Sequence, residues 1–169
     1  WFTETEPVET PAAGCRLTSA EEPQVCRFTP AEPGLYLVAA TVTDEKGRTQ
    51  KTTHALYAIG SGWVSWQQGD ARQLELVADK TLYDIDDTAR VLVKSPFPEA
   101  QALVTVEREG ILWSRQLEIK GSAQAIEVPL GEPMLPNVFV SVLLTRGRVP
   151  GSGEQDGDDP GRPAIAVGY

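Results

Sequence analysis

Long hydrophobic runs, basic charge, histidine and cysteine are all scarce in this chain of 169 residues. No apolar run approaches the roughly 20 residues of a membrane helix. Fifteen Lys and Arg stand against 24 Asp and Glu, a net charge of −9, which argues against nucleic acid or an anionic membrane surface as a partner. One His and two Cys fit no zinc pattern. We therefore expect no metal and no cofactor.

Side chains arranged for catalysis are equally sparse. A Ser–His–Asp set would need His54, which lies in an expected strand without a flanking motif. Glu107 and Glu109 share one face of an expected strand, as paired catalytic carboxylates can. We favour a solvated sheet face there, with Arg115 as a cross-strand partner. The chain is therefore not expected to be an enzyme.

Cys15 and Cys26 lie in two short runs, CRLTS and QVCRF, on either side of AEEP. If these runs pair antiparallel, the sulfurs meet across a hairpin, and a disulfide there would contribute about 2–3 kcal/mol. The alternative is two separate buried thiols. The spacing favours the disulfide, which would place the protein outside the cytoplasm.

Apolar residues alternate with period two, and almost no amphipathic helix is found. Residues 34–44 and 49–59 predict a hairpin that turns at Gly47, within the first segment of about four strands. Tyr36 stands near the start of the first strand, where the tyrosine of an immunoglobulin-like sandwich hydrogen-bonds back to the preceding corner.

The stretch GSGW at 60–63 interrupts this pattern and indicates a domain boundary. We assign residues 1–61 to a first domain, 62–72 to a linker and 73–169 to a second domain. Trp63 and Trp66 then lie at the junction. They either pack between domains, which we favour, or form an aromatic platform for a ligand.

The second segment predicts an antiparallel sandwich of seven strands and about 100 residues. Phe139, which alternates with valines in one of these strands, either is buried or contacts another domain. The first segment is too small to be stable alone, so we interpret it as the C-terminal part of a similar domain. The chain, which opens on Trp1 without a Met, is read as part of a longer protein. The expected strands are Leu74–Ala78, Ala89–Lys94, Ala102–Glu107, Ile111–Ile119, Ala125–Pro129, Val138–Thr145 and Ala164–Val167.

Several ordered motifs of the second segment resemble the macroglobulin-like domains of bacterial α2-macroglobulins, upstream of or next to the bait region. The matching residues are Asp79, Lys80, Tyr83, Asp87, Ala89, Ser95 to Phe97, Ala102 to Arg108 and Asn137 to Val140. The first segment resembles them in its Cys hairpin and in GLYLVAATVTDEKGR. Asp86 departs from the pattern, because the family usually has Gly there, and Asp tolerates a left-handed backbone less well.

The resemblance implies an all-β fold of two tandem immunoglobulin/fibronectin-III-like sandwiches, the first incomplete. It also implies a scaffold fragment of a broad-spectrum protease inhibitor, whose bait region is cut so that the body rearranges and traps the protease. The expected partners are neighbouring macroglobulin-like domains, target proteases through the bait region, and other periplasmic proteins. The expected location is the periplasm or the cell surface, with a membrane-anchored parent as one form. The alternative is an immunoglobulin-like binding or adhesin module.

The stretch GSGEQDGDDPGRP at 151–163 contains Gly151-Ser152-Gly153-Glu154-Gln155, which is similar to the family's thioester motif with Ser in place of Cys. Ser152 has no thiol to condense with Gln155, so we reject a thioester here. Asp156, Asp158 and Asp159 suggest calcium, but their order does not follow the usual spacing of calcium loops. We expect a mobile, solvated loop that proteases reach at the flanking Arg146, Arg148 and Arg162.

Overall fold

A computed structural model describes residues 8–66, 72–150, 159 and 161–169. The chain divides into two compact units, residues 1–31 and 32–169. Within the part described, residues 8–33 form no strand, so only two of the roughly four strands expected in the first segment are found. Residues 8–32 are exposed throughout. Since they have no buried face to pack against a sheet, their short alternating runs remain irregular.

The two strands of the first segment form one antiparallel hairpin, β1 (Gly34–Thr43) and β2 (Thr49–Ala58). Gly47 adopts φ 77° at the turn, a left-handed conformation that favours glycine. The hydroxyl of Tyr36 donates to the carbonyl oxygen of Glu32 at 2.8 Å, which confirms the expected corner. Both faces of the hairpin expose large apolar side chains, among them Leu35, Leu37 and Leu56.

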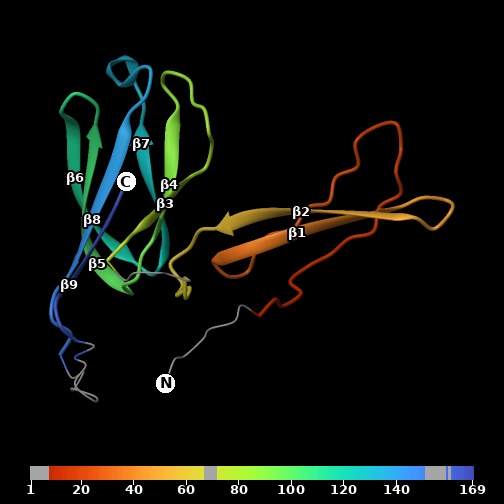
Figure 1. The fold of residues 1–169 in the computed structure, drawn as a ribbon, viewed down its shortest axis with the longest axis horizontal. Helices are drawn as coiled ribbons and strands as arrows, with labels where there is room; N and C mark the ends of the chain where they lie inside the picture. The colour runs from red at the N-terminus through yellow and green to blue at the C-terminus, as the bar shows by residue number, and fades with distance from the viewer. Residues whose placement is uncertain (1–7, 67–71, 151–158, 160) are drawn as a thin grey trace. The chain divides into compact units, whose positions relative to one another are not determined.

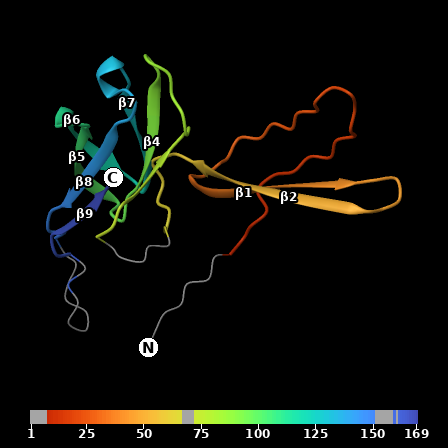
Figure 2. The ribbon, with the colours of Figure 1, turned by 45° about the horizontal axis from the view of Figure 1, so that its top comes forward.

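The second segment is a β-sandwich, and all seven strands expected in it are present (Figures 1 and 2). One sheet has the order β3-β4-β7 and the other β6-β5-β8-β9, with antiparallel pairing between the named strands. This confirms the immunoglobulin/fibronectin-III-like sandwich. The strands are β3 (Glu75–Ala78), β4 (Thr88–Lys94), β5 (Glu99–Glu107), β6 (Ile111–Lys120), β7 (Ala123–Pro129), β8 (Phe139–Arg146) and β9 (Ala164–Gly168).

The core lies between the two sheets and follows the alternation seen in the sequence. Ala102 and Val104 of β5 lie opposite Leu144 and Val142 of β8, and all four are at most 2% exposed. The facing sheet contributes Ala89, Val91 and Val93, together with Ile126 and Val128. Phe139 is 57% exposed, so its side chain lies on the outer face and not in this core.

The beginning of the sandwich lies beside its last strand. Gln73 forms a parallel bridge with Val167, and the amide of Leu74 donates to the carbonyl oxygen of Val167 at 2.9 Å. A Cβ atom at Gly168 would lie 2.1 Å from the carbonyl oxygen of Leu74, so this close approach requires glycine. In the part of the chain described, no helix is long and apolar enough to cross a membrane.

Candidate functional site

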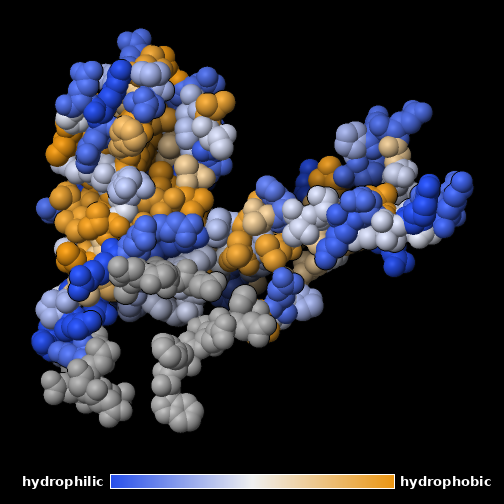
Figure 3. Space-filling model, in the orientation of Figure 1, coloured by the Kyte–Doolittle hydropathy of each residue, from blue (hydrophilic) through white to orange (hydrophobic). Residues whose placement is uncertain are grey.

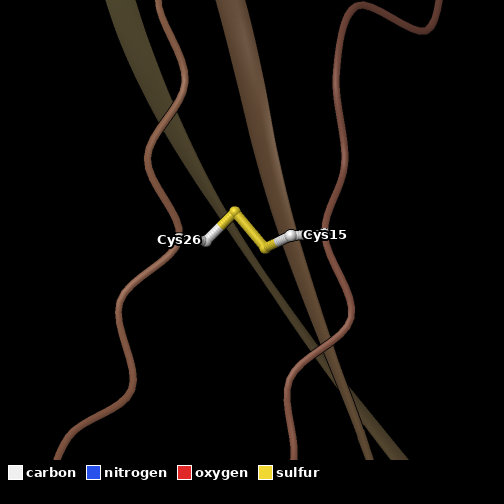
Figure 4. The surroundings of a disulfide bond; sticks show 2 residues. All are labelled: Cys15 and Cys26. Atoms are coloured by element: carbon white, nitrogen blue, oxygen red, sulfur yellow. A yellow bond between two sulfur atoms is a disulfide. The ribbon is translucent and has the colours of Figure 1, made fainter.

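A disulfide joins Cys15 and Cys26, with sulfurs 2.05 Å apart and Cα atoms 6.3 Å apart (Figure 4). The pairing is the one favoured by the spacing, but its setting differs from expectation. CRLTS and QVCRF do not form strands and are exposed. The cross-link therefore constrains an irregular segment without a backbone ladder.

The motif from Asp79 to Asp87 forms a hydrogen-bonded turn. The Tyr83 hydroxyl donates to Asp79 Oδ1 at 2.7 Å, and Arg90 N donates to the same oxygen at 2.9 Å. Lys80 Nζ binds Asp87 Oδ2 at 3.1 Å. The hydrogen bond from Tyr83 lowers the pKa of Asp79, and the hydrogen bond from Lys80 lowers the pKa of Asp87. Each of these carboxylates already accepts hydrogen bonds within the turn. We therefore assign the motif a structural role.

Asp86, which departs from the expected pattern, takes φ 70° in this turn. Its amide donates to the carbonyl oxygen of Leu130 at 3.2 Å, and the amide of Leu130 donates to the carbonyl oxygen of Asp87 at 2.9 Å. These bonds hold the backbone in the left-handed region although the residue is not glycine. The turn therefore forms with aspartate at this position, and the backbone of Asp86 is strained.

The expected pairing of Arg115 with the acidic residues at the end of β5 is wrong. Arg115 of β6 lies opposite Val104, whereas Glu107 lies opposite Ile111. Glu107 instead accepts a hydrogen bond from the Thr105 hydroxyl. Because facing residues share a side of the sheet, Arg115 lies on the inner side of the edge strand β6, away from Glu107.

The base of the connection between β8 and β9 is held on both sides. The amide of Val149 donates to the carbonyl oxygen of Gly161 at 2.9 Å, and Arg146 donates to the carbonyl oxygen of Arg162 at 2.8 Å. Arg148 binds Asp159 at 2.8 Å, which lowers the pKa of that carboxyl. Ser152, Glu154, Gln155, Asp156 and Asp158 lie outside the described residues, and with them most of the expected mobile loop. Within the described set, no three His, Cys, Asp or Glu side chains converge as metal ligands.

The outer face of sheet β3-β4-β7 carries a charged centre that sequence reasoning missed. Lys94 is 6% exposed. Its Nζ binds Glu75 Oε1 at 2.6 Å and the Tyr57 hydroxyl at 3.0 Å. The same Nζ lies 4.3 Å from the ring centre of Tyr57 and 5.3 Å from that of Trp66. This cation therefore connects β4 with both β2 and the segment after it.

A second set of contacts joins residues 60–66 to the turn between β6 and β7. Ser122 is 0% exposed, and its hydroxyl accepts from Val64 N and donates to Val64 O. The indole nitrogen of Trp66 donates to Ser122 O at 2.5 Å, and Gly60 N donates to Ala123 O at 2.9 Å. Gly121 has φ 79°, and a Cβ there would lie 2.3 Å from Ser61 O.

Trp66 thus packs at the junction, as favoured, with its ring 6.0 Å from that of Tyr57 at an interplanar angle of 66°. Trp63 does not, because it is 58% exposed. It lines an open groove together with Lys120, Thr145 and Arg148. His54, the other isolated candidate, lies on the exposed strand β2 opposite Val38.

Comparison with known proteins identifies the family. The model of the alpha-2-macroglobulin bait region domain matches residues 74–168, which is the second sandwich. The chain belongs to the alpha-2-macroglobulin family. The "Alpha-2-macroglobulin homolog" of Nostoc sp. is 30% identical over 134 residues, covering 79% of this chain and 7% of the relative. No solved structure matches the chain significantly.

Two further alpha-2-macroglobulin relatives are more distant. The "Alpha-2-macroglobulin" of Ralstonia nicotianae is 29% identical over 130 residues, which is 68% of this chain and 8% of the relative. An "Alpha-2-macroglobulin homolog" of Deinococcus radiodurans is 26% identical over 121 residues, which is 71% of this chain and 12% of the relative. The chain therefore spans about 7–12% of the length of these relatives.

Proposed function

We propose that the chain is a scaffold segment of an α2-macroglobulin that inhibits proteases by trapping them. The match of the bait region domain to the complete second sandwich carries this proposal. The carboxylates of the Asp79–Asp87 turn are engaged in structural hydrogen bonds, which supports a framework role. Family membership favours this function over an adhesin module.

The proposed partners within the parent protein are neighbouring macroglobulin-like domains. The outer face of sheet β6-β5-β8-β9 supports this, because Leu103, Leu143 and Val167 form one cross-strand row there. Leu103 is 36% exposed and Val167 46%. Apolar area also appears on the surface of this sandwich in Figure 3. A covering domain would remove this row from water, at about 25 cal/mol per Å² of apolar area.

The hairpin β1–β2 supports an incomplete first domain, since two strands alone are marginally stable in water. We propose that further strands of the parent cover its exposed apolar faces, and that residues 1–61 and 73–169 belong to separate domains. The disulfide supports a location outside the cytoplasm, in the periplasm or at the cell surface.

The test of trapping uses the full-length parent protein and a protease assayed on two substrates. Physical enclosure excludes a large protein substrate but admits a small peptide. We expect loss of activity on the protein substrate, while cleavage of the peptide continues. Equal loss of both activities would indicate blockage of the protease active site, and no loss would indicate no inhibition. Either result would contradict trapping.

A further inference from the structure

Several residues on the outer face of sheet β3-β4-β7 are buried, although the outer face of a sandwich is normally exposed to water. Along β4, the core positions are Ala89, Val91 and Val93. Leu92 and Lys94 lie on the opposite side of the strand, yet they are 4% and 6% exposed. Ala123, which is paired with Lys94 in the neighbouring strand β7, is 0% exposed. These residues must be covered by something other than the core.

The segment that reaches this face is residues 57–66, at the end of β2 and beyond it. It supplies Tyr57 and Trp66 to Lys94, and it supplies Gly60 and Val64 to the turn at Ser122. Contacts between backbone and buried polar groups fix its register, while the aromatic rings enclose a cation. Such a combination is typical of an interface that selects one partner, because a displaced segment would leave Lys94 and Ser122 buried without these bonds.

We infer that this face is an intrachain docking site for segment 57–66, and that Lys94 is the residue that controls its closure. The site recognises an aromatic pair through a desolvated ammonium and holds the backbone through Ser122. It opens as a unit, releasing segment 57–66 while the core between the two sheets stays folded. It is therefore a joint between the hairpin and the sandwich. This inference does not depend on the proposed trapping of proteases.

Two observations support opening as a unit. First, the contacts of segment 57–66 with Lys94 and Ser122 lie outside the core cluster, so their loss leaves no cavity in the core. Second, Lys94 keeps Glu75 as a partner within its own domain, so its charge is not left alone when the segment departs. The lysine then becomes hydrated, which limits the cost of opening.

Amide hydrogen exchange on the full 169-residue chain tests the joint. The variant Lys94→Met removes the cation and keeps an unbranched apolar side chain. We expect at least tenfold faster exchange of the Gly60 and Val64 amides, with unchanged exchange of the Val104 and Val142 amides in the core. The control Lys80→Met removes an equal charge from the β3–β4 turn, and it should leave Gly60 and Val64 unchanged.

Unchanged exchange at Gly60 and Val64 in Lys94→Met would overturn the inference, as would equal acceleration of all amides. If Lys94→Met does not fold, Tyr57→Leu decides, because it changes only the docked segment. The same selective tenfold acceleration is expected from it. Protection that survives in Tyr57→Leu would show that the aromatic–cation contact does not close the joint.

Discussion

Asp86 shows how one residue can adopt a conformation that its type disfavours. A left-handed backbone costs a non-glycine residue about 1–2 kcal/mol, and the hydrogen bonds to Leu130 hold Asp86 there. Replacement by Gly removes this strain, while the greater freedom of glycine in the unfolded chain costs about 0.4–1 kcal/mol. The strain is the larger effect.

We therefore expect Asp86→Gly to raise the free energy of unfolding by about 0.5–1 kcal/mol. Urea denaturation at neutral pH measures it. Asp84→Gly is the matched control, and it should destabilise the protein because residue 84 is not among those with positive φ. A destabilised Asp86→Gly would mean that the aspartate side chain stabilises the turn.

The same turn makes the free energy of unfolding depend on pH in the acidic range. The folded-state pKa values of Asp79 and Asp87 are lowered by hydrogen bonds from Tyr83 and Lys80. A lowered folded-state pKa gives stability that is complete above the unfolded value, about 3.9 for Asp, and that is lost as pH falls through the folded value. We expect the free energy of unfolding to decline below about pH 4.

Tyr83→Phe removes the largest cause of the shift at Asp79. It should lower stability at pH 7 and make the decline below about pH 4 shallower. Denaturant titrations of both proteins at several pH values measure this difference in slope. Parallel curves for the variant and the natural chain would show that Tyr83 does not set the pKa of Asp79.

At the scale of elements, β8 directs some of its side chains into the core and others to the surface. Leu144 is 0% exposed, whereas Phe139 is 57% exposed. Leu144→Ala should lower the free energy of unfolding by about 2–5 kcal/mol through lost burial and a cavity. Phe139→Ala, measured in the same denaturation series, should cost under about 1 kcal/mol. Similar losses from both would contradict the assignment of inner and outer faces.

The irregular segment around the disulfide allows a direct test of pairing. Arg16 and Arg27 are exposed, so trypsin should cut after both. In protein made under oxidising conditions, the peptides that contain Cys15 and Cys26 should then remain joined until a reductant is added. Mass spectrometry of the digest measures this. Two unlinked peptides in the oxidised sample would contradict the disulfide.

Period-two alternation was sufficient to predict all seven strands of the sandwich, because its core requires every second residue to be apolar. It was not sufficient around Cys15 and Cys26, where no sheet is present to give the alternation a buried side. It also gave the wrong neighbour for Arg115, since the tight turn after β5 places Arg115 opposite Val104, three residues before Glu107.

The joint at Lys94 was not predictable from local pattern. From local pattern, the lysine at the end of VLVK is predicted to be exposed to solvent, and Ser122 is predicted to be an ordinary turn residue. Both are buried only because residues 57–66, distant in the chain, lie on them. The one available signal was the glycine-rich stretch beside two tryptophans, which indicated the junction but not its partner on the sandwich.

At the scale of the whole molecule, the hydrogen bonds at the base of the β8–β9 connection predict how the sandwich responds to proteolysis. Limited trypsin cleavage after Arg148 should leave β9 paired with β8 through residues 142–146 and 164–168. We expect the cleaved sandwich to stay folded, with a lower melting temperature because β9 is no longer covalently tethered to β8.

Thermal melting before and after cleavage measures this, and Arg148→Gln, which lacks this one cleavage site, is the control. Complete unfolding of the cleaved chain would contradict a passive connection. A large compaction on cleavage would contradict it too, and would indicate that the connection acts as bait.

The parallel pairing of residues 72–74 with β9 also determines how the sandwich bears tension. A pull on its two ends draws these neighbouring segments past each other lengthwise. The bonds from Leu74 to Val167 and from Val167 to Arg72 are then loaded together in shear, and do not open one after another. Resistance to such a pull depends on the height of the unfolding barrier. A sandwich with this arrangement can carry mechanical load along a chain of domains without the early detachment of its edge strand β9.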